Sequence, residues 1–134
     1  MIKISKDVYG QMIRHAKKGY PNEACGILAG TDPDAAVVFY PMTNMDNASI
    51  SYFMDPREQL HVFKDMRQKS LGMRAIFHSH VASEAYPSQK DVRLAFYPDV
   101  SYLIVSLTDM DNPVLRSYKI VEEKVSEEEI GLAD

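Results

Sequence analysis

The sequence is poor in cysteine, which limits both its covalent chemistry and its choice of metal ligands. Cys25 is the only cysteine in the 134 residues. One thiol cannot form an intramolecular disulfide, and it cannot supply the four thiolates of an all-cysteine zinc site. No histidine stands beside Cys25 in the sequence, so we interpret it as a small, buried apolar residue rather than as a nucleophile.

An excess of basic residues and a long apolar run are also absent. Lys and Arg number 15 against 19 Asp and Glu, which gives a net charge of −4. Proteins that bind nucleic acid neutralise phosphates with basic side chains, so this balance argues against a nucleic-acid partner. No apolar segment reaches membrane-spanning length, and the first ten residues lack the apolar core of a signal peptide. We therefore expect a cytoplasmic protein without a membrane partner.

No internal repeat, low-complexity tract or linker divides the chain. A length of 134 residues with 46% hydrophobic residues is typical of one globular domain with a single core. We therefore expect residues 1–134 to form a single domain.

Three segments have the apolar spacing and the capping residues of helices, and a fourth has a cap alone. The first is predicted over residues 5–18, and the second begins at Asp55 and ends near Gly72. The third is predicted over residues 88–96, where Ser88 caps the start. Ser126, followed by three glutamates, predicts a short terminal helix.

Apolar runs between turn residues predict the strands. They are expected over residues 24–29, 35–40, 49–53, 73–77, 101–107 and 114–121. The resulting order, αββ(β)αβαββ, predicts a mixed α/β (α+β) domain built around one sheet.

His78 and His80 stand two residues apart at the end of a predicted strand. Side chains alternate across a strand, so both imidazoles should project from one face while Ser79 points away. Two imidazoles on one face suit two ligands of a tetrahedral zinc ion. Taken alone, the pair also fits two histidines that are merely hydrogen-bonded or exposed.

Ser88 and Asp91 have the spacing of a capping box, which by itself would explain both residues. A helix N-terminus also holds a carboxylate nearly fixed, and its oxygen could complete a zinc site of two histidines and one carboxylate. Catalytic zinc sites commonly use three protein ligands and leave one position for water. The two interpretations are compatible.

Glu23 comes directly before an apolar segment, where a carboxylate needs a partner or a function. It is either a surface carboxylate or a general base, and the second role requires its strand to lie beside the His78 strand. Ser88 could then donate a hydrogen bond to the oxyanion of a tetrahedral intermediate.

Four further residues are candidates for minor roles. His15 and His61 lie on predicted helices without the spacing of metal ligands, so we expect them at the surface. Tyr86 and Phe96 either border a peptide groove or pack in the core.

The combination of Glu23, His78-Ser79-His80, Ser88 and Asp91 has the spacing of the JAMM (MPN+) metalloprotease signature, and the chain resembles that family. Further segments similar to the family are residues 22–28, 52–56 and 102–106. The resemblance therefore covers nearly the whole chain.

The resemblance implies a single JAMM/MPN-type domain with a curved, mostly antiparallel sheet flanked by helices, similar to the cytidine deaminase fold. It implies that His78, His80 and Asp91 bind one Zn²⁺ together with a water. Glu23 would then be the base, and Ser88 would stabilise the oxyanion. One departure is Val81, which stands where a proline often follows the second histidine. The resemblance therefore does not predict the path of this loop or the shape of the substrate groove.

The resemblance also implies a small prokaryotic-type peptidase or isopeptidase. Its substrate would be the C-terminal tail of a ubiquitin-like or sulfur-carrier protein. Two alternatives are a non-catalytic MPN scaffold, which usually lacks the ligands, and a zinc peptidase that acts on cell-wall or phage-tail peptides. A homodimer, and a supporting role for Cys25 near the site, are both left open.

Overall fold

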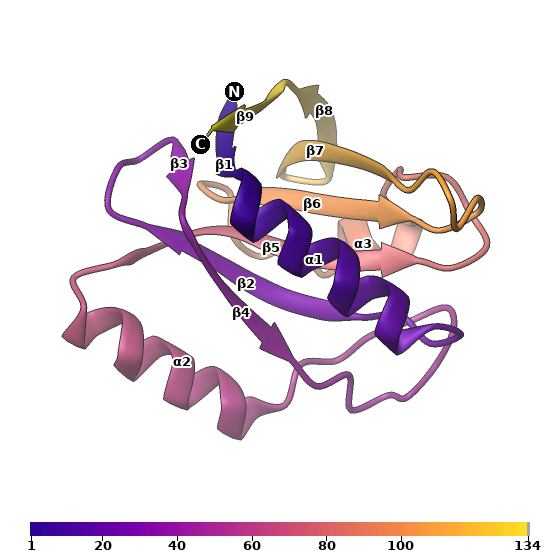
Figure 1. Cartoon of the computed structure of the whole chain (residues 1–134), viewed down its shortest axis with the longest axis horizontal. Coiled ribbons are helices and arrows are strands. Elements are labelled where there is room, and N and C mark those ends of the chain that lie inside the picture. Colours follow the sequence, from indigo (N-terminus) through magenta and orange to yellow (C-terminus); the bar gives the residue numbers. More distant parts are fainter. Residues whose placement is uncertain (134) are drawn as a thin grey trace.

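Two sheets and three helices make up the structure, a computed structural model that describes residues 1–133 (Figure 1). The larger sheet has the strand order β4-β2-β5-β6-β7-β8. Its strands are β2 (Cys25–Gly30), β4 (Val38–Met42), β5 (Gly72–His80), β6 (Ser101–Ser106), β7 (Val114–Val121) and β8 (Lys124–Glu128). Neighbouring strands are antiparallel except for the parallel pair β5–β6. The prediction of a mixed, mostly antiparallel fold is confirmed.

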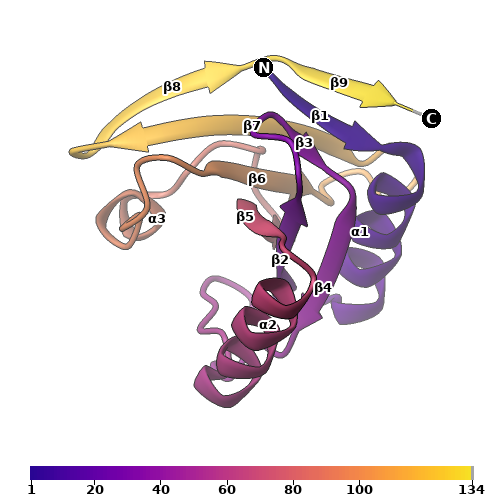
Figure 2. The same ribbon diagram turned by 90° about the vertical axis from the view of Figure 1, so that its left-hand side faces the viewer.

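A second, smaller sheet corrects the expectation of a single sheet. It pairs β1 (Ile2–Ser5) in parallel with β3 (Ala35–Ala36) on one side and β9 (Ile130–Ala133) on the other. The two ends of the chain therefore lie side by side (Figure 2). Pairing between segments far apart in sequence has no local signature, which is why β1 and β9 were not predicted.

The predicted terminal helix from Ser126 is wrong. Ser126 lies in β8, where it pairs with Lys119 of β7, and Val125 pairs with Ile120. The carboxylate of Glu128 accepts a hydrogen bond from the Ser101 hydroxyl at 3.0 Å. These pairings with β7 and β6 outweigh the helix preference of three successive glutamates.

The first helix, α1 (Lys6–Gly19), covers one face of the larger sheet (Figures 1 and 2). The Ser5 hydroxyl accepts a hydrogen bond from the Val8 amide and caps its start. Its apolar stripe packs on the sheet in one core cluster, which includes Val8, Met12, Ala16, Leu28, Ala75, Phe77, Leu103 and Val105. Alternate residues of each strand therefore face α1, as the period of a strand requires.

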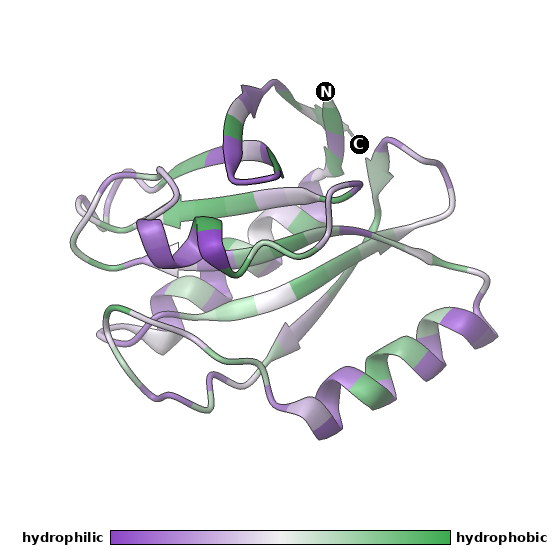
Figure 3. Cartoon of the chain, turned by 180° about the vertical axis from the view of Figure 1, so that it is seen from behind, coloured by the Kyte–Doolittle hydropathy of each residue, from purple (hydrophilic) through white to green (hydrophobic). Residues whose placement is uncertain are grey.

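The opposite face of the sheet carries the two other helices. Helix α2 (Pro56–Gln68) begins after the Asp55 cap and packs Met66 against the β2–β4 side. Helix α3 (Gln89–Arg93) lies on the β6–β7 side of the same face, where Val92 packs against a buried cluster from β6 and β7. In Figure 3, the residues of α3 are mostly hydrophilic, whereas those of β6 beside it are strongly hydrophobic. The carboxyl end of β5 lies between these two clusters.

Two further expectations on this face are corrected. Residues 49–53 form no strand, and the chain there makes only an isolated bridge between Asn44 and Met54. The third helix ends at Arg93 instead of residue 96. Ala95 still packs against the core, but Phe96 is 71% exposed and the Tyr97 amide donates to the Tyr102 hydroxyl instead of to a helical carbonyl. Within residues 1–133, no helix has both the length and the apolar character needed to cross a membrane.

Gly26 provides a test of how tightly β2 and β4 pack. A Cβ atom at this position would lie 2.5 Å from the Phe39 ring and 2.9 Å from the Tyr40 carbonyl oxygen. We expect Gly26→Ala to lower the free energy of unfolding by about 1–3 kcal/mol, measured by urea denaturation. Gly131→Ala is the matched control, because its nearest neighbour would be the Met1 sulfur at 3.5 Å. Equal stability of the two variants would contradict this packing.

Candidate metal and catalytic site

Two histidines and one aspartate converge at the carboxyl end of β5. His78 and His80 project from the same face of the strand and are 2% and 4% exposed. Their Nε2 atoms are 3.1 Å apart, and each lies 3.1 Å from Oδ2 of Asp91 on α3. The structure thus brings all three predicted ligands together, and burial excludes the alternative of histidines exposed at a strand end.

The hydrogen bonds of His80 orient its ring for metal binding. Its Nδ1 lies 2.8 Å from the Glu84 carbonyl oxygen. A carbonyl can only accept, so Nδ1 carries a proton, and this hydrogen bond turns Nε2 toward Asp91. The His78 ring stacks on Tyr52, with centroids 4.7 Å apart, and burial lowers the pKa of His78. Burial also opposes the charged form of His80, but Asp91 and the Glu84 carbonyl raise the pKa of His80 overall. Two imidazoles and a carboxylate therefore face one another.

This donor set fits a zinc ion. Ligand atoms around a tetrahedral zinc with bonds of about 2.0–2.1 Å are separated by about 3.3 Å, close to the 3.1 Å triangle observed here. Within residues 1–133, the type and spacing of their ligand atoms identify these three groups as a cluster that could hold a metal ion. Two imidazoles and one carboxylate leave a fourth position for water or substrate.

Asp91 is both a helix cap and a candidate ligand. Its Oδ2 accepts a hydrogen bond from the Ser88 amide at 2.9 Å, and its own amide donates to the Ser88 hydroxyl oxygen at 3.1 Å. Burial alone would raise the pKa of Asp91, but hydrogen bonds from His78 and His80 hold that pKa well below its usual range. The capping box thus fixes an ionised carboxylate against the two histidines.

The register of β2 against β5 places Glu23 beside this cluster. Cys25 pairs with His78, and Ala24 exchanges two hydrogen bonds with Ser79, through the Ser79 amide at 3.0 Å and the Ser79 hydroxyl at 2.8 Å. Glu23 is 6% exposed and lines a cavity of about 370 Å³ together with His80 and Ser88. The required adjacency of the two strands is present, and the alternative of a surface carboxylate is wrong.

The surroundings of Glu23 suit a group that accepts and returns a proton near neutral pH. Burial raises the pKa of Glu23 to about 7, although His80 and Lys90 act in the opposite direction. Its buried Oε1 has no hydrogen-bond partner within the described residues. A general base is most effective when its pKa lies close to the working pH.

Asn44 is a site residue that the sequence analysis missed. Its amide group donates to the carbonyl oxygens of Glu23 and Ser51, both at 3.0 Å, and its side-chain oxygen accepts from the amides of Asp46 and Phe53. Asn44 therefore ties the backbone of Glu23 to the loop of residues 44–54. No periodicity or motif marks it, because its partners lie elsewhere in the chain. Ser79, in contrast, alternates with the two histidines along β5, so its side chain is expected to point away from them, and its hydroxyl oxygen accepts a hydrogen bond from the Ala24 amide.

A second cavity, of about 240 Å³, lies next to Asp91. We call it the apolar groove, and its main apolar residues are Tyr52, Phe53, Met54, Ile76, Leu94, Phe96 and Tyr97. Asp91 and Lys90 also line it. Phe96 therefore borders a groove, and the alternative of core packing is wrong for it and for Tyr86, which is also exposed.

The remaining candidates take structural positions. Cys25 is buried, and burial raises the pKa of its thiol to about 12, which confirms it as an unreactive packing residue. His61 is exposed, as expected. The expectation for His15 is wrong: it is half-buried, its ring packs edge-on against Phe39, and its Nε2 lies 3.0 Å from the Cys25 carbonyl oxygen.

The pKa of Glu23 predicts how the stability of the metal-free protein depends on pH. The carboxyl group titrates at about 7 in the folded state and near its ordinary value of 4.5 when unfolded. The folded state thus holds this proton more tightly, and the resulting stabilisation is lost as the pH rises from 4.5 through 7. Relative to Glu23→Gln, the native protein should lose about 2 kcal/mol between pH 5 and pH 8.

Urea unfolding at both pH values, in the presence of a chelator, measures this effect. Glu129→Gln, which removes an exposed carboxylate, is the control, and its free energy of unfolding should change with pH as that of the native protein does. A stability difference between native protein and Glu23→Gln that stays constant with pH would contradict a buried, proton-binding Glu23.

Comparison with known proteins places this site in a family. Residues 5–121 match the family model described as prokaryotic homologs of the JAB domain. The chain is 41% identical over 132 residues to the CysO-cysteine peptidase of Mycobacterium tuberculosis, covering 98% of this chain and 90% of that protein. It is 30% identical over 112 residues to the desampylase of Haloferax volcanii, covering 78% and 80%.

A solved structure agrees with this relationship. The solution structure of a protein from Desulfitobacterium hafniense is 46% identical and superposes with a TM-score of 0.89. The match covers 100% of this chain and 94% of that protein. The two chains thus share the fold described above over nearly their whole length.

Proposed function

Because the chain belongs to the prokaryotic homologs of the JAB domain, the small prokaryotic JAMM/MPN family that its sequence resembles, we propose that it is a zinc-dependent peptidase. The proposed reaction is hydrolysis of an amide bond at the C-terminal tail of a ubiquitin-like or sulfur-carrier protein. The observation that carries the proposal is the buried triangle of His78, His80 and Asp91 with Glu23 beside it. Residues 1–134 would act as one catalytic domain.

In this proposal His78, His80 and Asp91 hold the zinc ion. When bound, zinc supplies Lewis-acid polarisation of the substrate carbonyl and activation of water. Glu23 accepts the proton of the attacking water as the oxygen adds to the carbonyl carbon. Glu23 then returns the proton to the amine nitrogen as the carbon–nitrogen bond breaks, which leaves a carboxylate on the tail and a free amine.

Ser88 is proposed to stabilise the negative charge that develops on the carbonyl oxygen. The Ser88 hydroxyl oxygen accepts a hydrogen bond from the Asp91 amide. The hydroxyl proton of Ser88 therefore remains available to donate into the cavity that Ser88 lines with Glu23 and His80. A donor fixed in advance stabilises a transition-state oxyanion more effectively than mobile water does.

The two cavities suggest how the substrate lies. Glu23 must reach the leaving nitrogen, so the leaving amine belongs in the cavity of Glu23, whose loop wall consists of Val81, Ala82 and Ser83. The carrier tail then occupies the apolar groove, which Asp91 also lines. The presence of all three candidate ligands and the base argues against a non-catalytic scaffold. The names of the relatives favour a carrier-protein tail over cell-wall or phage-tail peptides.

Glu23→Gln tests the chemistry apart from the metal. The probe is a ubiquitin-like sulfur-carrier protein whose Gly-Gly end is extended by a short peptide, with cleavage followed by mass spectrometry. We expect zinc-loaded native protein to remove the extension. The side-chain amide introduced by Glu23→Gln cannot accept a proton, so cleavage should slow by about 10²-fold or more while the zinc content stays at one per chain. Glu129→Gln should cleave at the native rate. Absent cleavage by native protein would refute the proposed substrate, and full activity of Glu23→Gln would refute the proposed base.

His80→Ala tests the metal ligands. Removing one of three ligands should abolish stable zinc binding, measured by metal analysis after dialysis against a weak chelator. His61→Ala, which removes an exposed histidine of α2, should retain one zinc per chain. Equal zinc content in the two variants would place the metal elsewhere.

A further inference from the structure

The loop of residues 81–87 connects His80 to the helix that carries Asp91, so its path influences two of the proposed ligands. It has no regular secondary structure. The site therefore depends on whatever holds this loop in place.

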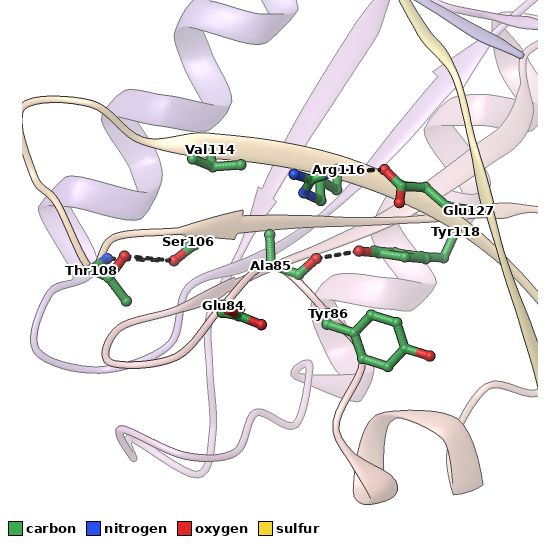
Figure 4. A pocket seen from close by; sticks show the side chains of 9 residues that line it. All are labelled: Glu84, Ala85, Tyr86, Ser106, Thr108, Val114, Arg116, Tyr118 and Glu127. Carbon is green, nitrogen blue, oxygen red and sulfur yellow. Dashed lines mark hydrogen bonds and ion pairs between the residues drawn. The ribbon is translucent and has the colours of Figure 1, made fainter.

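Three consecutive carbonyl groups of the loop accept hydrogen bonds from side chains outside it. The Ser83 carbonyl accepts from the Ser106 hydroxyl at 2.7 Å, and the Glu84 carbonyl accepts from His80 Nδ1 at 2.8 Å. The Ala85 carbonyl accepts from the Tyr118 hydroxyl, as Figure 4 shows. The carbonyl that orients the metal ligand thus lies between two carbonyls anchored by the sheet.

Both anchors come from rigid parts of the core. Tyr118 lies in β7, is 2% exposed and pairs with Tyr102 of β6. Ser106 is the last residue of β6 and is also buried. The Tyr118 ring additionally packs edge-on against Tyr86 of the loop, with centroids 5.4 Å apart.

We propose that Tyr118 and Ser106 are positioning residues for His80. They fix the loop so that the Glu84 carbonyl holds the proton on His80 Nδ1 and leaves Nε2 directed at Asp91. A partner that orients a metal-binding histidine in this way contributes about 10–100-fold to metal affinity. This inference rests on the proposed zinc site and extends it to residues of β6 and β7 that do not touch the metal.

The competing explanation is that the Tyr118 hydroxyl only satisfies a buried polar group. Both explanations predict a loss of stability when the hydroxyl is removed, but only positioning predicts a loss of zinc affinity. Tyr102 offers a matched control, because it is also buried and its hydroxyl accepts a hydrogen bond from the Tyr97 amide, which lies outside the 81–87 loop. Tyr118→Phe and Tyr102→Phe are thus the same chemical change on two paired residues.

The experiment is a zinc titration of chelator-stripped native protein and of both variants, in competition with a chromophoric chelator. We expect Tyr118→Phe to raise the zinc Kd about 10-fold and Tyr102→Phe to leave it within about twofold of native. Ser106→Ala, which removes the other anchor, should also raise the Kd. It serves as the second test if Tyr118→Phe does not fold.

Nitrogen-15 NMR of the histidine rings provides a readout that does not depend on zinc. In metal-free native protein the His80 Nδ1 should carry a proton that is hydrogen-bonded to the Glu84 carbonyl, and Tyr118→Phe should weaken that hydrogen bond. Native zinc affinity in Tyr118→Phe and Ser106→Ala, or equal weakening in Tyr102→Phe, would overturn the positioning role and leave the proposed peptidase intact. Failure of the native protein to bind zinc would instead refute the proposed function itself.

Discussion

The pairing of Cys25 with His78 across β2 and β5 is the constraint on which the site depends. A strand presents alternate residues to opposite faces, so a slip of one residue in this register would turn the two histidines away from Asp91. The same pairing places Ala24 against Ser79 and thereby sets Glu23, the next residue back, beside the histidines. Asn44 then fixes the Glu23 carbonyl to the loop that forms one wall of the apolar groove. The pairing of β2 with β5 thus positions the proposed general base, the proposed ligands and one wall of the groove relative to one another.

The rest of the site consists of two short segments, helix α3 and the 81–87 loop. Helix α3 has only five residues, and its value lies in its capping box, which presents an ionised Asp91 to the histidines. The 81–87 loop is irregular but is anchored to the sheet through successive carbonyl groups. Val81, which departs from the proline common in the family, lines the cavity of Glu23 together with the small residues Ala82 and Ser83. The path of this loop follows from Ser106 and Tyr118, which lie well beyond it in the sequence.

Features with a local signature could be predicted from the sequence, and features formed by distant pairing could not. The alternation around His78 and His80, the capping box of Asp91 and the stripe of α1 each lie within a few residues, and the structure contains all of them. Glu23 could be placed near the histidines only through the family resemblance, because strand pairing is not local. The terminal helix from Ser126 failed for the same reason, since β7 supplies the partner that local propensity ignores. Asn44 reaches Glu23, and Tyr118 reaches Ala85, through long-range hydrogen bonds that no sequence pattern indicates.

X-ray absorption of the zinc-loaded protein tests most directly whether His78, His80 and Asp91 form the metal site. The account predicts one zinc with nitrogen and oxygen ligands at about 2.0–2.1 Å, outer-shell scattering from two imidazole rings, and loss of this spectrum in Asp91→Ala. A sulfur ligand at about 2.3 Å, which would implicate Cys25, or a spectrum unchanged in Asp91→Ala, would contradict it.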